Sequence, residues 1–286
     1  MKQSNYYVPH SSIWPIFGAV SLFFVATGLG LLIAFNSKLS IFLCMIGFVL
    51  LIIMFSGWFG IIINESAQGL YNSQVNNSFI QGMSWFIFSE IMFFAAFFGV
   101  LVYLRVFAIP WLGGEGNNEM TNVILWPDFT NHWPLSLMPD GTKTEIMKPW
   151  GLPLINTIIL ICSSITLYFS HYFLDKKKTT LSSFYLVLTI LLGFSFIFLQ
   201  FEEYMHAYIH MGLTLQSGVY GSVFFLLTGF HGLHVILGTI FLIVIWVRMI
   251  NGAFLSENNF GYQAGVWYWH FVDIIWLCVF AFVYVF

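Results

Sequence analysis

One carboxylate lies inside a long apolar run and is the strongest candidate for chemistry in this chain. Glu90 is part of the segment WFIFSEIMFFAAFFGVLVYL, which contains no Lys or Arg. A carboxylate within a membrane-spanning helix is costly unless it is paired, hydrated or protonated, and removal from water favours its neutral form. We therefore expect Glu90 to face another helix. It would act there either as a proton-handling group or as a neutral acid whose hydrogen bond only supports packing.

Two histidines in the segment GFHGLHV form the next candidate group. His231 and His234 are three residues apart, so they share one helical face. Paired imidazoles inside a helical bundle could ligate haem, copper or iron. However, no Cys or Glu accompanies them at ligand spacing. The sequence therefore favours hydrogen bonds to neighbouring helices, with metal ligation as the alternative.

His270 and Asp273 repeat this spacing of three in the segment WYWHFVD. A carboxylate at this distance along a helix could hydrogen-bond the imidazole and orient it. No nucleophile in the sequence pattern completes a catalytic triad with them. We predict a polar contact between helices here, and we expect neither a catalytic nor a metal-ligating residue in the chain.

A last polar cluster follows an apolar run and contains Glu202, Glu203, His206 and His210. Glu203 and His206 read E-x-x-H, which is half of a carboxylate di-iron motif. Because the second half is missing, we expect these four residues to form a solvated helix end.

The elements that position these residues follow from composition. Only 7% of the 286 residues are charged and 59% are hydrophobic, whereas an ordinary soluble domain is about 25% charged and 45–50% apolar. This excludes a soluble globular protein. Lys and Arg total 9 against 12 Asp and Glu, so no basic face could follow a phosphate backbone, and nucleic acid is excluded as a partner.

Seven runs are long enough to cross a bilayer, which takes about 20 mostly apolar residues. We expect helices near 15–35, 40–63, 80–104, 153–174, 182–201, 218–247 and 263–285. The predicted fold class is an all-α polytopic membrane protein, with one membrane domain over 1–286 and one extramembrane loop at 105–152. The distribution of Lys and Arg in the short loops favours a cytoplasmic or matrix N-terminus.

Several strings are similar to subunit III of cytochrome c oxidase. They are PLINT (153–157), LQFEEY (199–204), SGVYGSVFFLLTGFHGLHVILG (217–238), WYWHFVDIIWL (267–277), IFSEIMFFAAFFG around Glu90, WFGIIINES, and the opening YYVPHSSIWP. The resemblance extends in register over essentially the whole chain. The loop motif WLGGEG (111–116) resembles proteobacterial members in particular, so the chain is identified as a member of that family, of proteobacterial type.

This resemblance implies a seven-helix accessory subunit in two bundles with a lipid-filled cleft. It implies no cofactor in this chain, since haem and copper belong to the partner subunits I and II, and it implies bound structural phospholipids. The subunit would support proton uptake and the stability of the catalytic subunit. The implied location is the bacterial inner (plasma) membrane, with the mitochondrial inner membrane as the alternative.

The resemblance also assigns residues. Glu90 matches the membrane carboxylate of the family, and the lipid-binding positions match Trp58, Glu65, Ser66 and Arg248. The guanidinium of Arg248 suits a phosphate bidentately, and the alternative is an ordinary snorkelling arginine. Two other functions stay open. One is a stand-alone transporter that uses Glu90 for ion coupling, and the other is a free-standing membrane metalloenzyme built on the histidines.

Overall fold

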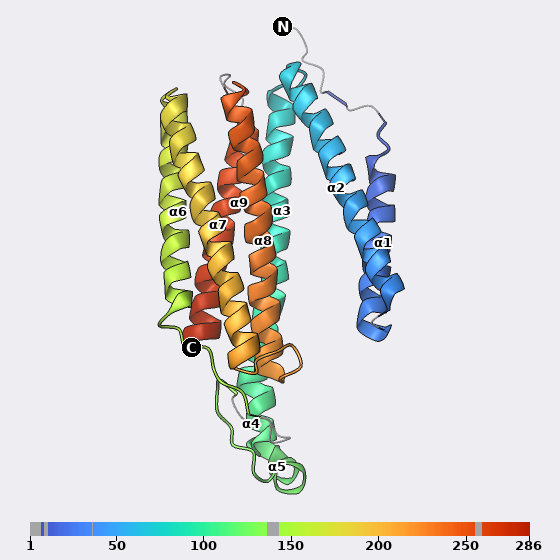
Figure 1. Ribbon diagram of the computed structural model, residues 1–286, viewed down its shortest axis with the longest axis vertical. Helices are drawn as coiled ribbons and strands as arrows, with labels where there is room; N and C mark the ends of the chain where they lie inside the picture. Colours follow the sequence, from blue (N-terminus) through green and yellow to red (C-terminus); the bar gives the residue numbers. More distant parts are fainter. Residues whose placement is uncertain (1–6, 9–10, 36, 136–142, 255–258) are drawn as a thin grey trace. The chain divides into compact units, whose positions relative to one another are not determined.

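The computed structural model describes residues 7–8, 11–35, 37–135, 143–254 and 259–286. Within these ranges the chain is helical and has no β-strand. Seven helices are long and apolar enough to cross a membrane, which confirms the predicted fold class (Figure 1).

Each predicted run coincides with one of these helices. Their bounds are α1 Trp14–Phe35, α2 Lys38–Ala67, α3 Ser73–Tyr103, α6 Leu152–Asp175, α7 Thr179–His210, α8 Val219–Ile250 and α9 Phe260–Val279. Two of them continue through π-helical segments, α3 through Leu104–Ala108 into α4 (Ile109–Leu112) and α9 through Phe280–Val285. The predicted loop at 105–152 therefore starts later than expected. It also contains the short helix α5, Glu119–Leu125.

The chain divides into two compact units, Met1–Phe79 and Ile80–Phe286, which agrees with the expected two bundles. In the first unit α1 and α2 run antiparallel (Figure 1). Glycines allow them to touch, because a Cβ added at Gly28 would lie 2.6 Å from the Cys44 nitrogen and one at Gly47 would lie 2.7 Å from the Val25 nitrogen. Small residues at such positions let helices approach closely in lipid, where apolar burial alone does not hold them together. The helix α3 begins in this unit and continues into the second.

The second unit packs α6, α7, α8 and α9 against one another. Hydroxyl groups of α6 accept hydrogen bonds from two buried indoles of α9, Trp269 Nε1 to Ser163 Oγ at 2.9 Å and Trp276 Nε1 to Thr157 Oγ1 at 3.0 Å. Both rings are almost completely buried. The polar edge of each indole thus has a partner inside the bundle, as a buried tryptophan requires.

Candidate functional site

Glu90 and His234 meet between α3 and α8. The Oε2 atom of Glu90 lies 2.8 Å from Nε2 of His234, and the two side chains are 23% and 11% exposed. In the structure, Glu90 therefore faces α8. The sequence did not indicate its partner, since the two residues are separated by 144 positions.

The tautomer of His234 follows from its second nitrogen. Nδ1 lies 2.7 Å from the carbonyl oxygen of Phe230, and a carbonyl oxygen only accepts, so Nδ1 carries a hydrogen. The bond to Glu90 then has two forms. Either a neutral acid donates to a bare Nε2, or an imidazolium donates to a carboxylate. Both forms hold one proton between the two side chains.

Aromatic rings surround this proton-sharing pair. The His234 ring lies 5.1 Å from that of Phe94, 6.2 Å from Phe93 and 6.4 Å from Tyr268, centroid to centroid. Such rings form a medium of low polarity, which strengthens a hydrogen bond inside it. The pair can hold a proton within the membrane, and neither group carries redox chemistry.

His231 points to a different helix. Its Nε2 lies 3.1 Å from the carbonyl oxygen of Val272 in α9, and its ring is completely buried beside those of Phe196 and Trp276. Both histidines of GFHGLHV therefore make the interhelical hydrogen bonds that the sequence favours. Within the described ranges, no three His, Cys, Asp or Glu side chains come together in a group that could hold a metal ion.

His270 and Asp273 are linked through a serine of α6. Ser164 Oγ donates to Asp273 Oδ2 at 2.7 Å and lies 3.3 Å from His270 Nδ1. The predicted polar contact between helices is thus present, but a hydroxyl group stands between the imidazole and the carboxylate. In a catalytic triad the serine donates to the imidazole. Here it donates to the carboxylate, so the arrangement does not activate a nucleophile.

Glu203 corrects the expectation of a fully solvated helix end. It is 1% exposed, and Tyr284 Oη donates to its Oε1 at 2.6 Å. The other three members of the predicted cluster, Glu202, His206 and His210, are exposed as expected. The apolar run ends before Glu203, but α7 continues to His210 because one face of this last stretch stays packed, with Ala207 completely buried.

Glu65 holds two tyrosines in the first unit. Its Oε1 accepts from Tyr7 Oη at 2.9 Å and its Oε2 from Tyr71 Oη at 2.7 Å. The hydrogen bond to Glu65 raises the pKa of Tyr7, and burial together with this bond raises the pKa of Tyr71 well above its usual range. Nearby, Trp58 is 42% exposed and Ser66 is exposed as well.

Arg248 lies in the last turn of α8. Its guanidinium carbon is 5.0 Å from the centre of the Phe254 ring, and its buried Nε has no hydrogen-bond partner within the described part of the chain. Among the described residues, no carboxylate lies within 4 Å of it. This cationic group therefore retains donors for an anion.

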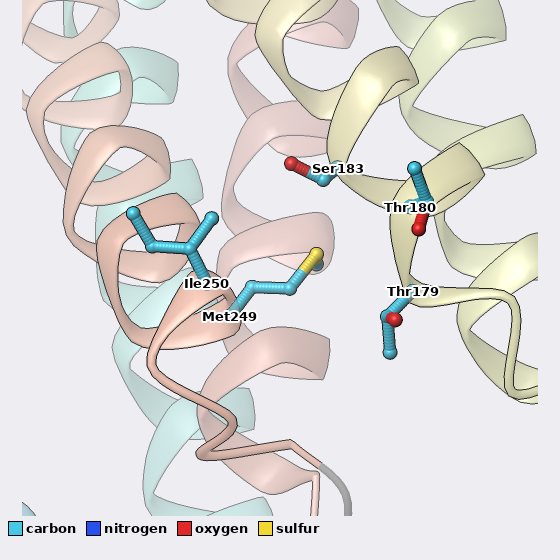
Figure 2. A pocket seen from close by; sticks show the side chains of 5 residues that line it. All are labelled: Thr179, Thr180, Ser183, Met249 and Ile250. Carbon is cyan, nitrogen blue, oxygen red and sulfur yellow. The ribbon is translucent and has the colours of Figure 1, made fainter.

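An open pocket of about 290 Å³ lies between the start of α7 and the end of α8 (Figure 2). Thr179, Thr180 and Ser183 of α7 face Met249 and Ile250 of α8 across it. Ser183 Oγ also accepts from Trp246 Nε1 at 2.9 Å. One wall offers hydroxyl groups and the other is apolar, and the sequence pattern did not indicate this pocket.

Comparisons with known proteins agree over nearly the whole chain. The model of the family described as "Cytochrome c oxidase subunit III" matches residues 4–114 and 126–286. Curated relatives named "Cytochrome c oxidase subunit 3" come from Tetraodon nigroviridis (37% identical over 280 residues), Gadus morhua (38% over 280) and Latimeria chalumnae (38% over 282). Each alignment covers 98% of this chain and 96% of the relative. All three relatives are vertebrate proteins, whereas the loop motif WLGGEG had pointed to proteobacterial members.

Proposed function

Because this chain belongs to the cytochrome c oxidase subunit III family, we propose that it is an accessory, non-redox subunit of a proton-pumping cytochrome c oxidase in aerobic respiration. The family match over nearly the full length carries this conclusion. The partners would be subunits I and II, which would hold the haem and copper, and this chain would dock on subunit I. The complex reduces dioxygen, and this chain itself is not catalytic.

Purification in mild detergent tests the assignment. A tag on this chain should recover larger haem-bearing chains and oxygen-consuming activity. The same tag on an unrelated polytopic protein of that membrane should recover neither. Recovery of the tagged chain alone, with activity remaining in the untagged fraction, would refute the proposal.

The Glu90–His234 pair would support proton uptake by the complex. The proton that Glu90 and His234 share would be available for exchange. The hydrogen bond between them would keep α3 and α8 joined. A stand-alone transporter that uses Glu90 for ion coupling is the alternative, and the family assignment does not favour it. Ion flux in liposomes that contain only this chain separates the two functions.

Phospholipid binding is the second part of the proposal. In the second unit the Arg248 guanidinium group, which has no carboxylate within 4 Å among the described residues, would supply the positive charge that a phosphate needs. The next two residues of α8, Met249 and Ile250, line one wall of the pocket, and the hydroxyl groups of α7 line the other (Figure 2). In the first unit the exposed Trp58 and Ser66 would contact lipid. Glu65 would contribute by holding Tyr7 and Tyr71 in place.

The chain would lie in a bacterial plasma membrane, with the mitochondrial inner membrane as the alternative. The loop motif WLGGEG supports the first location and the vertebrate relatives support the second. Both are inner membranes of a respiring compartment. Fractionation of the source cells, with a haem stain on each membrane fraction, distinguishes them.

A further inference from the structure

A buried polar cluster lies at one end of the second unit, where α6 begins and where α7 and the last segment of the chain end (Figure 1). Its members are Asn156 of α6, Gln200 and Glu203 of α7, and Tyr284 of the terminal π-helical segment. They are 0%, 6%, 1% and 5% exposed, respectively. Polar groups this deeply buried need partners, because each unpaired one costs free energy.

Two hydrogen bonds satisfy part of the cluster. Tyr284 Oη donates to Glu203 Oε1 at 2.6 Å, and Asn156 Nδ2 donates to Gln200 Oε1 at 3.3 Å. Three buried atoms of this cluster have no hydrogen-bond partner among the residues that the structure describes: Asn156 Oδ1, Gln200 Nε2 and Glu203 Oε2. Exchanging oxygen and nitrogen in both carboxamides does not help. One amide donor and one amide acceptor are left over in either assignment.

The three unpaired atoms belong to side chains that adjoin one another. The Asn156 and Gln200 carboxamides are in contact. Gln200 and Glu203 are three residues apart on α7, which places them on one helical face. The Gln200 side chain lies near the Glu203 carboxyl group, without the geometry of a hydrogen bond to it. The three unpaired atoms therefore belong to one contiguous group of side chains.

The unpaired atoms determine which small species suits this group of side chains. The Tyr284 hydroxyl hydrogen is already bonded to Glu203 Oε1, so the unpaired atoms are one amide donor, Gln200 Nε2, and two oxygens, Asn156 Oδ1 and Glu203 Oε2. Calcium takes six to eight oxygen ligands, so the set does not suit such a cation, and the Glu203 carboxyl group disfavours an anion. A water molecule donates two hydrogen bonds and accepts two, and buried waters commonly make about three.

The charge of Glu203 follows from its surroundings. The titratable side chains near it include three tyrosines, Tyr204, Tyr220 and Tyr284. Among the described residues, no Lys, Arg or His lies within 4 Å of it. An unpaired carboxylate at this depth is costly, whereas a neutral acid is not.

We propose that Asn156, Gln200 and Glu203 bind one ordered water inside the membrane and that Glu203 is a neutral carboxylic acid. The water accepts from Gln200 Nε2 and from the acid proton on Glu203 Oε2, and it donates to Asn156 Oδ1. The acid proton is thereby hydrogen-bonded to this ordered water near the end of the bundle. The site joins α6 to α7 and is separate from the Glu90–His234 pair.

A density map at water-resolving quality tests this on the protein purified with its native partners. We expect one peak within hydrogen-bonding distance of the three side chains in the unaltered protein. The peak should be lost in Asn156→Leu, which keeps the shape but removes both polar atoms. It should persist in Phe201→Leu, an exposed neighbour on α7. An empty site in the unaltered protein, or a peak surrounded by five or more oxygens, would overturn the proposal.

Infrared spectroscopy tests the protonation state independently of whether Asn156→Leu folds. The unaltered protein should show the carbonyl band of a protonated carboxylic acid that shifts in D₂O. Glu203→Gln should lack this band and keep the ordered water, because its amide hydrogen replaces the acid proton. A spectrum of the unaltered protein in which Glu203→Gln removes only carboxylate bands would overturn the neutral acid.

Discussion

At the scale of single residues, the protein places its ionisable groups in pairs that cross from one helix to another. Glu90 bonds His234, and Asp273 bonds Ser164, which also contacts His270. A polar group in a membrane interior is stabilised only when such a partner is present. The bonds therefore join helices and at the same time hold protons.

Replacement of Glu90 separates these two roles. In Glu90→Gln the side-chain amide can still donate to the bare Nε2 of His234, so we expect assembly and most oxidase activity to be retained. Glu90→Ala leaves that nitrogen without a partner and creates a void, at about 1–3 kcal/mol for the unpaired group. It should weaken retention of this subunit. Oxygen consumption and proton release per electron measure both variants. Full loss of turnover in an assembled Gln variant would contradict the structural role.

The two histidines of α8 should not affect the metals of the complex. His231→Leu and His234→Leu, made separately, should leave the haem and copper content unchanged, because their nitrogens bond Val272 and Glu90. Each should lower stability by about 1 kcal/mol per lost interhelical bond. Metal analysis and thermal unfolding of the purified complex are the measurements. Loss of haem or copper from either variant would show that the histidine is a ligand.

At the scale of helices, close approach depends on single glycines. A Cβ added at Gly193 of α7 would lie 2.8 Å from the Trp269 ring and 2.9 Å from Thr239 Oγ1, whereas nothing lies within 4 Å of one added at Gly232 of α8. Only the first of these two glycines is required for packing. The small-residue spacing of Thr228 and Gly232 in the sequence does not by itself identify a contact.

These two glycines give a matched comparison. Gly193→Ala should destabilise the subunit by about 1–3 kcal/mol, because it forces the rings and helices apart. Gly232→Ala should be neutral or stabilising by up to about 1 kcal/mol, because alanine favours the helix. Thermal unfolding of the purified complex checks both. Equal destabilisation by the two changes would contradict the close contact at Gly193.

The tether between Glu65 and its tyrosines should depend on pH. Both tyrosines have a raised pKa in the folded state, so folding holds their protons more tightly than the unfolded chain does. Their contribution is complete below the ordinary tyrosine pKa of about 10 and is lost as the pH rises above it. We expect proteolytic cleavage between Tyr7 and Val8 to be slow at neutral pH and to become faster at strongly alkaline pH.

A pair of variants isolates that tether. Tyr7→Phe should give fast cleavage between residues 7 and 8 already at neutral pH, since it removes the hydrogen bond to Glu65 Oε1. Tyr103→Phe, at a half-exposed tyrosine of α3, should leave cleavage unchanged. If Tyr7→Phe is cleaved at this site at the rate of the unaltered protein, the hydrogen bond between Tyr7 and Glu65 does not protect the site from cleavage.

At the scale of the whole molecule, many large apolar side chains of the membrane-spanning helices are exposed. In a protein that spans a membrane, these side chains are covered by lipid and by partner subunits. As proposed above, a lipid headgroup would find a positive charge at Arg248 and an amphipathic ring at Trp58.

Lipid content should therefore change without loss of haem. We expect Arg248→Ala and Trp58→Ala to lower the phospholipid bound per complex, while the haem absorbance stays the same. Arg105→Ala and Trp85→Ala are the matched controls on α3 and its extension, and they should retain more lipid. Mass spectrometry of the purified complex measures the stoichiometry. Unchanged lipid content in both test variants would show that Arg248 and Trp58 do not bind phospholipid.

The sequence by itself determined the fold class, the seven spans and the family. Hydropathy is a local property, so a run such as 153–174 indicates a span without knowledge of its neighbours. The same local signal placed Glu90 inside the membrane. It also predicted helix ends too early, as at Glu203. A carboxylate next to an apolar run is predicted to be solvated unless its buried partner, here Tyr284, is known.

Only the tertiary structure decided which groups meet. The pairs Glu90–His234, Ser164–Asp273 and Glu203–Tyr284 are 144, 109 and 81 residues apart along the chain. The spacing of residues within one helix indicates a shared face, but it carries no information on which helix that face touches. That choice depends on side-chain volumes and hydrogen-bond geometry across the whole bundle, and these are fixed only when the helices pack.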